Sequence, residues 1–263
     1  NLNSIYISSD MLTAAKAGET RVWLGTLIQK GMLVGRSMDA QKTFDGLGLE
    51  SDLVSVTLMQ RDESGTFKAQ RTWSNSDLLR RSVISTESLS DVRESPAMNF
   101  GKVAAGAIHV FSPVLPEGEP LLSVTIPFAK SEEGSFGTVL SLVVRQERLL
   151  ESFSDTGAFA LTLVDHEGIV LAHSETARVR GRESLAHLPI VRKMIDSQME
   201  RDFQEYETDG QSYLGAFAQV GIGGIGVVSQ LARARAFEAG EMLVRRSILI
   251  AVLVMSISFI IAY

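Results

Sequence analysis

The sequence predicts an α+β protein: a long N-terminal helix, then two antiparallel sheets with helices, then a C-terminal transmembrane helix. Three observations support this prediction. Apolar residues recur at helical spacings over residues 2–42, without a proline. The order strand, strand, helices, strand, strand, strand then occurs twice, which favours antiparallel sheets with helices on one face. The last 17 residues contain no charged residue, proline or glycine.

The composition excludes several classes of function. A chain of 263 residues can form one large or two small domains with a sizeable core. It has no cysteine, which excludes disulfides, thiolate metal sites and thiol nucleophiles. Its net charge of −6 argues against nucleic acid as a partner, because nucleic-acid binding needs a basic surface.

The N-terminal helix is predicted from spacings of three, four and seven between its apolar residues. About 40 helical residues would span about 60 Å. The turn residues Asp45–Gly48 then end it. Residues 1–45 are therefore assigned to a helical spine.

Residues 46–150 are predicted to form the first module. Its apolar segments are separated by turns that contain glycine, proline and charged residues. The predicted strands are 53–60, 66–73, 107–114, 121–128 and 137–144, with helical segments at 76–94 and 145–153.

Residues 151–231 are predicted to repeat this order in a second module. One local similarity supports the repeat: Gly137–Arg145 (GTVLSLVVR) resembles Gly226–Arg233 (GVVSQLAR), and each leads from a strand into a helix. The predicted strands are 159–164, 169–173, 203–206, 213–219 and 226–230, with a helical segment at 185–201.

Residues 232–263 are predicted to form an exit helix and a truncated transmembrane helix. The apolar run 247–263 meets the lower limit of about 17 residues for a membrane span. A chain that starts without Met and stops inside this run is expected to be part of a larger membrane protein. Arg245 and Arg246 precede the run and, taken alone, would place the body of the protein in the cytoplasm.

Two segments carry a resemblance to a known family. Leu163–Glu175 (LVDHEGIVLAHSE) and Tyr213–Ala239 resemble the strand–turn–strand element and the final strands with exit helix of double Cache domains. The long N-terminal helix and the final run also agree with that family. The resemblance implies two PAS-like modules, of which the membrane-distal one usually binds the ligand, and a body that is periplasmic and anchored in the inner membrane.

The family resemblance also implies a function. It predicts a sensor that binds a small-molecule ligand and passes the signal through the C-terminal helix to a cytoplasmic output. The segment 104–153 and His187–Val191 resemble sensors of spirochaete-type cyclases, so an adenylate or guanylate cyclase is the favoured output. The alternatives are a chemotaxis receptor, a histidine kinase, or a structural dimerisation ectodomain without a ligand. A homodimer in the membrane is expected.

The candidate ligand-binding residues lie in the first module. Arg71 and Trp73 are two apart on a predicted strand, so their side chains share a face. An arginine and a tryptophan at this place resemble the motif that holds the ligand carboxylate in amino-acid-binding relatives, although Ser74 replaces the family's tyrosine and the acid Asp77 fits poorly. The alternative is an Arg–Trp stack at a sheet edge. We expect three residues of later strands to line the same concave face: His109, Phe111 and Phe128.

The second module offers weaker candidates. His173, Tyr206 and Tyr213 could form a second site, but core packing with a satisfied hydroxyl is the favoured interpretation. Gly221–Gly226 satisfies G-x-G-x-x-G, yet a strand follows it, which indicates a hairpin turn with positive φ rather than a dinucleotide site.

The sequence contains no catalytic pattern. Asp165, His166 and Glu167 are expected in an exposed turn, and Val170 stands where a zinc-protease motif needs its second histidine. No Gly-x-Ser-x-Gly motif occurs. We therefore predict no catalytic site, no cofactor and no metal in this chain.

Overall fold

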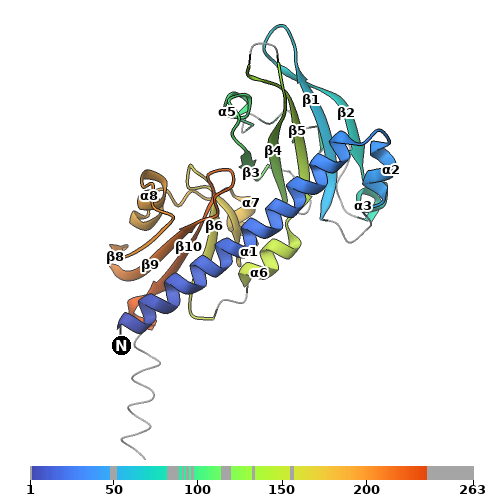
Figure 1. Ribbon diagram of the computed structural model, residues 1–263. Coiled ribbons are helices and arrows are strands. Elements are labelled where there is room, and N and C mark those ends of the chain that lie inside the picture. The colour runs from blue at the N-terminus through green and yellow to red at the C-terminus, as the bar shows by residue number, and fades with distance from the viewer. Residues whose placement is uncertain are drawn as a thin grey trace, which may run out of the picture.

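The protein, as a computed structural model, consists of two five-stranded antiparallel sheets arranged along one long helix (Figure 1). The structure describes residues 2–47, 52–81, 89, 90, 92, 95, 98–113, 120–131, 134–154 and 157–235. Figure 1 shows helix α1 (Leu2–Arg36) running diagonally across both sheets. The α+β class, the long N-terminal helix and the two sheets predicted from the sequence are confirmed.

The predicted helix over residues 2–42 is interrupted. Helix α1 ends at Arg36, and a separate helix α2 (Ala40–Asp45) begins after a short turn. The Asp39 side chain accepts a hydrogen bond from the Lys42 backbone N–H at 3.3 Å and so caps α2. A capping residue inside the periodic pattern is the physical reason why the helix breaks here.

The first sheet has the strand order β2-β1-β5-β4-β3. The last strand of the module, β5, pairs with both β1 and β4, so it lies at the centre of the sheet. Its strands are β1 (Leu53–Arg61), β2 (Phe67–Ser74), β3 (His109–Phe111), β4 (Leu121–Lys130) and β5 (Phe136–Arg145), and its helices are α3 (Ser76–Arg81), α5 (Phe100–Ala104) and α6 (Glu147–Ser154).

The second sheet repeats this topology in the order β7-β6-β10-β9-β8. Strands β5 and β10, which carry the similar sequences noted above, both occupy the central place, so the predicted repeat is confirmed in the topology. The strands are β6 (Ala160–Val164), β7 (Val170–His173), β8 (Arg201–Thr208), β9 (Gln211–Gln219) and β10 (Gly226–Ala232). Helices α7 (Thr176–Arg180) and α8 (Pro189–Asp196) follow β7.

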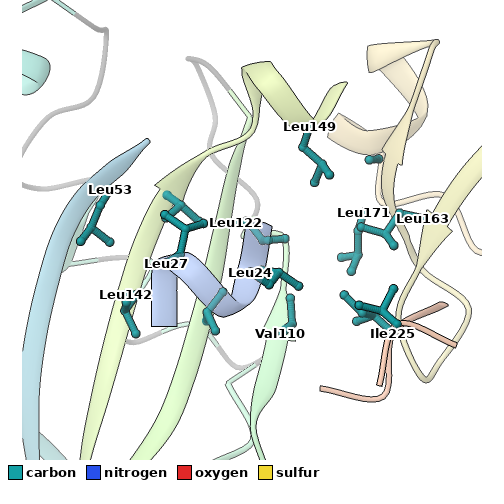
Figure 2. Close-up of a cluster of buried hydrophobic side chains, with 14 of the residues drawn as sticks. Leu24, Leu27, Leu53, Val110, Leu122, Leu142, Leu149, Leu163, Leu171 and Ile225 are labelled. Carbon is teal, nitrogen blue, oxygen red and sulfur yellow. The ribbon is translucent and has the colours of Figure 1, made fainter. Parts of the chain in front are cut away.

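One buried core extends across both sheets along α1. Leu24 and Leu27 of α1 belong to the same cluster as Leu142 of the first sheet and Leu163 of the second (Figure 2). Gly35 lets the first sheet approach the helix closely, because a Cβ atom there would lie 2.8 Å from Leu140 Cδ1.

The predicted membrane segment falls outside this description. Residues 247–263 and most of the predicted exit helix are not among the described residues. Within the described ranges, none of the helices combines the length and the apolar character that crossing a bilayer requires.

Candidate functional site

The first sheet has two chemically different faces. Side chains alternate between the faces along each strand, and directly paired residues share a face. Val56 and Leu58 of β1 pack against the α1 core, so their neighbour Thr57 points to the opposite side. We call this opposite side, away from α1, the outer face of the first sheet.

A row of polar residues crosses this outer face. Thr57 pairs with Ser141, Ser141 with Thr125, and Thr125 with His109, so the four residues lie side by side on β1, β5, β4 and β3. The neighbouring pair of Ser123 and Phe111 extends the row. We refer to Thr57, Ser123, Thr125 and Ser141 as the hydroxyl row.

The hydroxyl row is buried and incompletely hydrogen-bonded. Ser123 and Ser141 are fully buried, and within the described part of the chain their Oγ atoms have no hydrogen-bond partner. The Thr125 hydroxyl donates to the weak acceptor Met98 Sδ, at 3.0 Å. A buried polar group without a partner costs about 1–3 kcal/mol. The row therefore provides hydrogen-bonding groups that a small polar guest or a water molecule would satisfy.

Apolar clusters flank the hydroxyl row on both sides. They come from the outer face of the strands and from the segments that cover it. One cluster contains Val54, Leu89, Val92, Leu121 and Val143, and the other contains Met59, Phe67, Val103 and Val139. The arrangement of a narrow polar stripe between apolar walls is typical of small-molecule sites.

The five candidate residues from the sequence do not share one face, contrary to expectation. Trp73 pairs with Val56 and Arg71 with Leu58, which places both on the α1 side. Trp73 is half-buried against the α1 core, and Arg71 is exposed.

Phe128 also lies on the α1 side, where its Cε2 atom would be 3.2 Å from a Cβ at Gly35. His109 and Phe111 lie on the outer face, and their rings stack with centroids 5.5 Å apart. The strand register, which is decided by tertiary pairing, separates these residues. The side chain of Asp77 is outside the described set.

The second module contains a pocket of about 540 Å³. His173 and Tyr213 line it, and the buried Tyr206 adjoins it through a hydrogen bond from Gln230 Nε2 at 2.5 Å. Burial raises the pKa of Tyr206 to about 12 and lowers the pKa of His173. Arg178 at the pocket rim is already paired with Glu175 and Glu183.

The turn at Asp165 differs from its prediction as an exposed turn. Asp165 is buried, and its Oδ1 accepts hydrogen bonds from the backbone N–H groups of Glu167 and Ile169, at 2.8 and 2.9 Å. Burial raises the pKa of this carboxyl group, against the lowering effect of these two bonds. His166 is half-buried, and its ring lies edge-on to His109 with centroids 5.9 Å apart.

The predicted glycine hairpin is confirmed. Gly221, Gly223 and Gly224 have positive φ angles of 77°, 64° and 67° and connect β9 to β10. This turn reaches the first module, because a Cβ at Gly223 would lie 2.6 Å from Val110 Cγ2.

Among the described residues, no three metal-binding side chains come together.

Sequence reasoning missed the hydroxyl row. A signal was present, because Ser123, Thr125 and Ser141 interrupt otherwise apolar strands. Two of these residues alternate along one strand, which indicates a shared face. Only the strand pairing, however, brings them beside Thr57.

Comparisons with known proteins identify relatives in fold only. No family model and no curated protein sequence matches the chain. Among solved structures, the ligand-binding domain of the Pseudomonas aeruginosa amino acid chemoreceptor PctC, in complex with GABA, has a TM-score of 0.52 at 18% identity. The match covers 88% of this chain and 100% of that one.

Two further structures have the same arrangement. The ligand-binding domain of the Pseudomonas fluorescens chemoreceptor CtaA, in complex with L-leucine, has a TM-score of 0.53 at 16% identity and covers 90% of this chain and 98% of that one. The extracellular domain of rpHK1S-Z16, described as a histidine kinase, has a TM-score of 0.58 at 11% identity, with coverages of 90% and 98%. The chain thus has the fold of extracellular receptor domains.

Proposed function

We propose that this chain is the extracytoplasmic sensor module of a membrane-bound signalling receptor and that it binds a small molecule over the hydroxyl row. The observation that carries the proposal is the pair of fully buried Oγ atoms of Ser123 and Ser141, which have no partner in the described structure. The fold shared with ligand-binding domains of chemoreceptors supports a sensor role.

The ligand has a polar group that bonds to Ser141 and Ser123 and an apolar part between the flanking clusters. His109 and Phe111 close the row at its β3 end, which retains these two sequence-predicted residues in the site. Binding shifts a two-state equilibrium of the first module. The shift passes along α1, which packs against both sheets, to the predicted C-terminal helix and the inner membrane.

The cytoplasmic output is a separate part of the proposal. The resemblance to cyclase sensors favours an adenylate or guanylate cyclase, whereas the similar structures named above come from chemoreceptors and from a protein described as a histidine kinase. The similarity in fold to these domains supports the alternative outputs, a chemotaxis receptor or a histidine kinase. Fusing the chain to each type of output region and measuring ligand-dependent activity in cells distinguishes them.

A thermal-shift screen of the 263-residue chain in detergent tests ligand binding. The library contains amino acids, organic acids, amines and nucleobases. We expect one class to raise the melting temperature and expect Ser141→Ala to reduce that increase. Thr138→Val on the same strand is the matched control, because Thr138 points to the other face. A compound that raises the melting temperature of Ser141→Ala and Ser123→Ala as much as that of the wild type would bind outside the hydroxyl row.

An exposed stripe on α1 favours the predicted homodimer as a second role. Met11, Val22 and Leu33 are exposed and recur every eleven residues, which is close to three helical turns and therefore one face. The buried residues Leu24 and Leu27 lie on the other side. Val22→Glu is expected to convert a dimer to a monomer in analytical ultracentrifugation. A wild-type chain that is monomeric at high concentration contradicts this role.

A further inference from the structure

A second pocket lies between the two modules, next to the β3 end of the hydroxyl row. It encloses about 430 Å³. Phe100, His109 and Phe111 line it from the first module, and His166 and Arg182 line it from the second. We propose that this pocket binds a small monocarboxylate with an apolar body, which bridges the two modules.

Arg182 is the group that would hold the carboxylate. Within the described residues, its guanidinium group makes no ion pair or hydrogen bond, unlike Arg178 four residues earlier. Its backbone is held in place: the Arg182 N–H donates to the Val179 carbonyl oxygen at 3.0 Å, and φ is 48°. An unpaired guanidinium group that lines a pocket, carried by a hydrogen-bonded backbone, is suited to bidentate binding of a carboxylate.

His166 supplies a second polar group from the same side. Its Nε2 atom is buried and has no hydrogen-bond partner among the described residues; Glu167 Oε1 lies 3.8 Å away. With the proton on Nε2, the imidazole donates a hydrogen bond to a carboxylate oxygen. The ligand thereby satisfies a buried donor that otherwise remains unpaired.

Two acidic residues, Asp165 and Glu167, also line the pocket, but within the described structure neither is paired with Arg182. Asp165 Oδ1 is already engaged by the backbone N–H groups of its own turn. The Glu167 side chain is 68% exposed, so solvent screens its charge. Arg182 therefore remains the cation available to an anionic ligand.

The first module provides an apolar wall for the rest of the ligand. Phe111 stacks on His109 at 5.5 Å, and Phe100 stacks on Phe67 at 4.9 Å, so neighbouring rings hold both aromatic side chains in place. A bare phosphate or sulfate would leave this wall in contact with water. A carboxylate attached to an aromatic or branched aliphatic body fits both sides of the pocket.

Calorimetric titration of the full chain in detergent with benzoate tests the proposal, and benzamide is the uncharged control. We expect saturable benzoate binding that is at least tenfold tighter than benzamide binding. Arg182→Ala is expected to weaken benzoate binding by about 10- to 100-fold, the range for a lost hydrogen bond to a charged group. Arg180→Ala, an exposed arginine outside the pocket, leaves it unchanged.

Two further variants guard against misfolding as the explanation. His166→Phe removes the donor and is expected to weaken binding, whereas His166→Gln keeps a donor near the Nε2 position and restores most of it. Ser141→Ala leaves benzoate binding intact, which separates this site from the one proposed over the hydroxyl row. No saturable benzoate binding at 10 mM, or equal losses in Arg182→Ala and Arg180→Ala, would overturn the inference.

Discussion

Ser9 on α1 and Ser229 on β10 are joined by a buried hydrogen bond of 2.7 Å between their Oγ atoms. Thr13, one turn further along α1, donates a second hydrogen bond to Ser229 Oγ at 2.8 Å. Strand β10 is the central strand of the second sheet and leads toward the C-terminus. These directional bonds set the position of α1 along β10.

Ser229→Ala is expected to lower the free energy of unfolding by about 1–3 kcal/mol, because the Ser9 hydroxyl loses its partner in a buried place. Urea unfolding followed by circular dichroism measures the change. Ser141→Ala is the matched control, since Ser141 is also a fully buried serine in a central strand but has no described partner. It is expected to be neutral or stabilising. Equal losses in the two variants would contradict the specific role of the Ser9–Ser229 bond.

Gly223→Ala is expected to destabilise the junction between the modules by about 2 kcal/mol or more. The added Cβ would lie 2.6 Å from Val110 Cγ2, and the φ of 64° is unfavourable for alanine. Gly210→Ala isolates the backbone effect, because Gly210 has a similar φ of 72° with nothing within 4 Å of its Cβ position. A loss in Gly223→Ala no larger than in Gly210→Ala would show that the contact with Val110 is unimportant.

Arg71→Ala and Trp73→Ala test whether the α1 side of the first sheet takes part in ligand binding, because both residues lie on that side. Trp73→Ala is expected to cost about 2 kcal/mol of stability, less than a fully buried aromatic residue, because the side chain is half-buried against the α1 core. Arg71→Ala is expected to be nearly neutral. Both variants should retain the ligand-induced thermal shift. A lost shift in the stable Arg71→Ala variant would instead support the carboxylate-binding role predicted from the sequence.

The stability of the second module is expected to fall as the pH decreases below 6.5. Burial lowers the pKa of His173 from its usual 6.5, so the unfolded chain takes up a proton that the folded protein excludes. The stabilisation that the neutral His173 contributes is complete above pH 6.5, and it is lost as the pH falls from 6.5 toward the lower pKa of His173 in the folded protein. His173→Asn does not titrate and can still accept the hydrogen bond that Nδ1 receives from Glu175 N–H at 2.9 Å.

Urea unfolding between pH 5 and 8 checks this expectation. The slope of the unfolding free energy with pH should be smaller in His173→Asn than in the wild type. His187→Asn, at an exposed histidine, serves as the control and should retain the wild-type slope. An unchanged slope in His173→Asn means that another group causes any pH dependence.

Local patterns were sufficient to predict most elements. Apolar segments bounded by turn residues located all ten described strands to within a few residues, and the periodicity of the N-terminal segment located α1. Helix α7 was missed because Thr176–Arg180 is too short to display a helical period. The break between α1 and α2 was missed because the apolar spacing continues across the capping residue Asp39.

The sequence by itself determined the α+β class, the internal repeat and the glycine hairpin, because these depend on residue spacing and on backbone preferences along the chain. Only the tertiary structure decided which side chains meet. Strand register placed Arg71 and Trp73 on the face opposite His109 and assembled the hydroxyl row from β1, β4 and β5. Packing of the β6–β7 turn against the first module brought His166 beside His109. A shift of one residue in pairing reverses the face of every side chain in a strand, so such contacts depend on packing between distant segments.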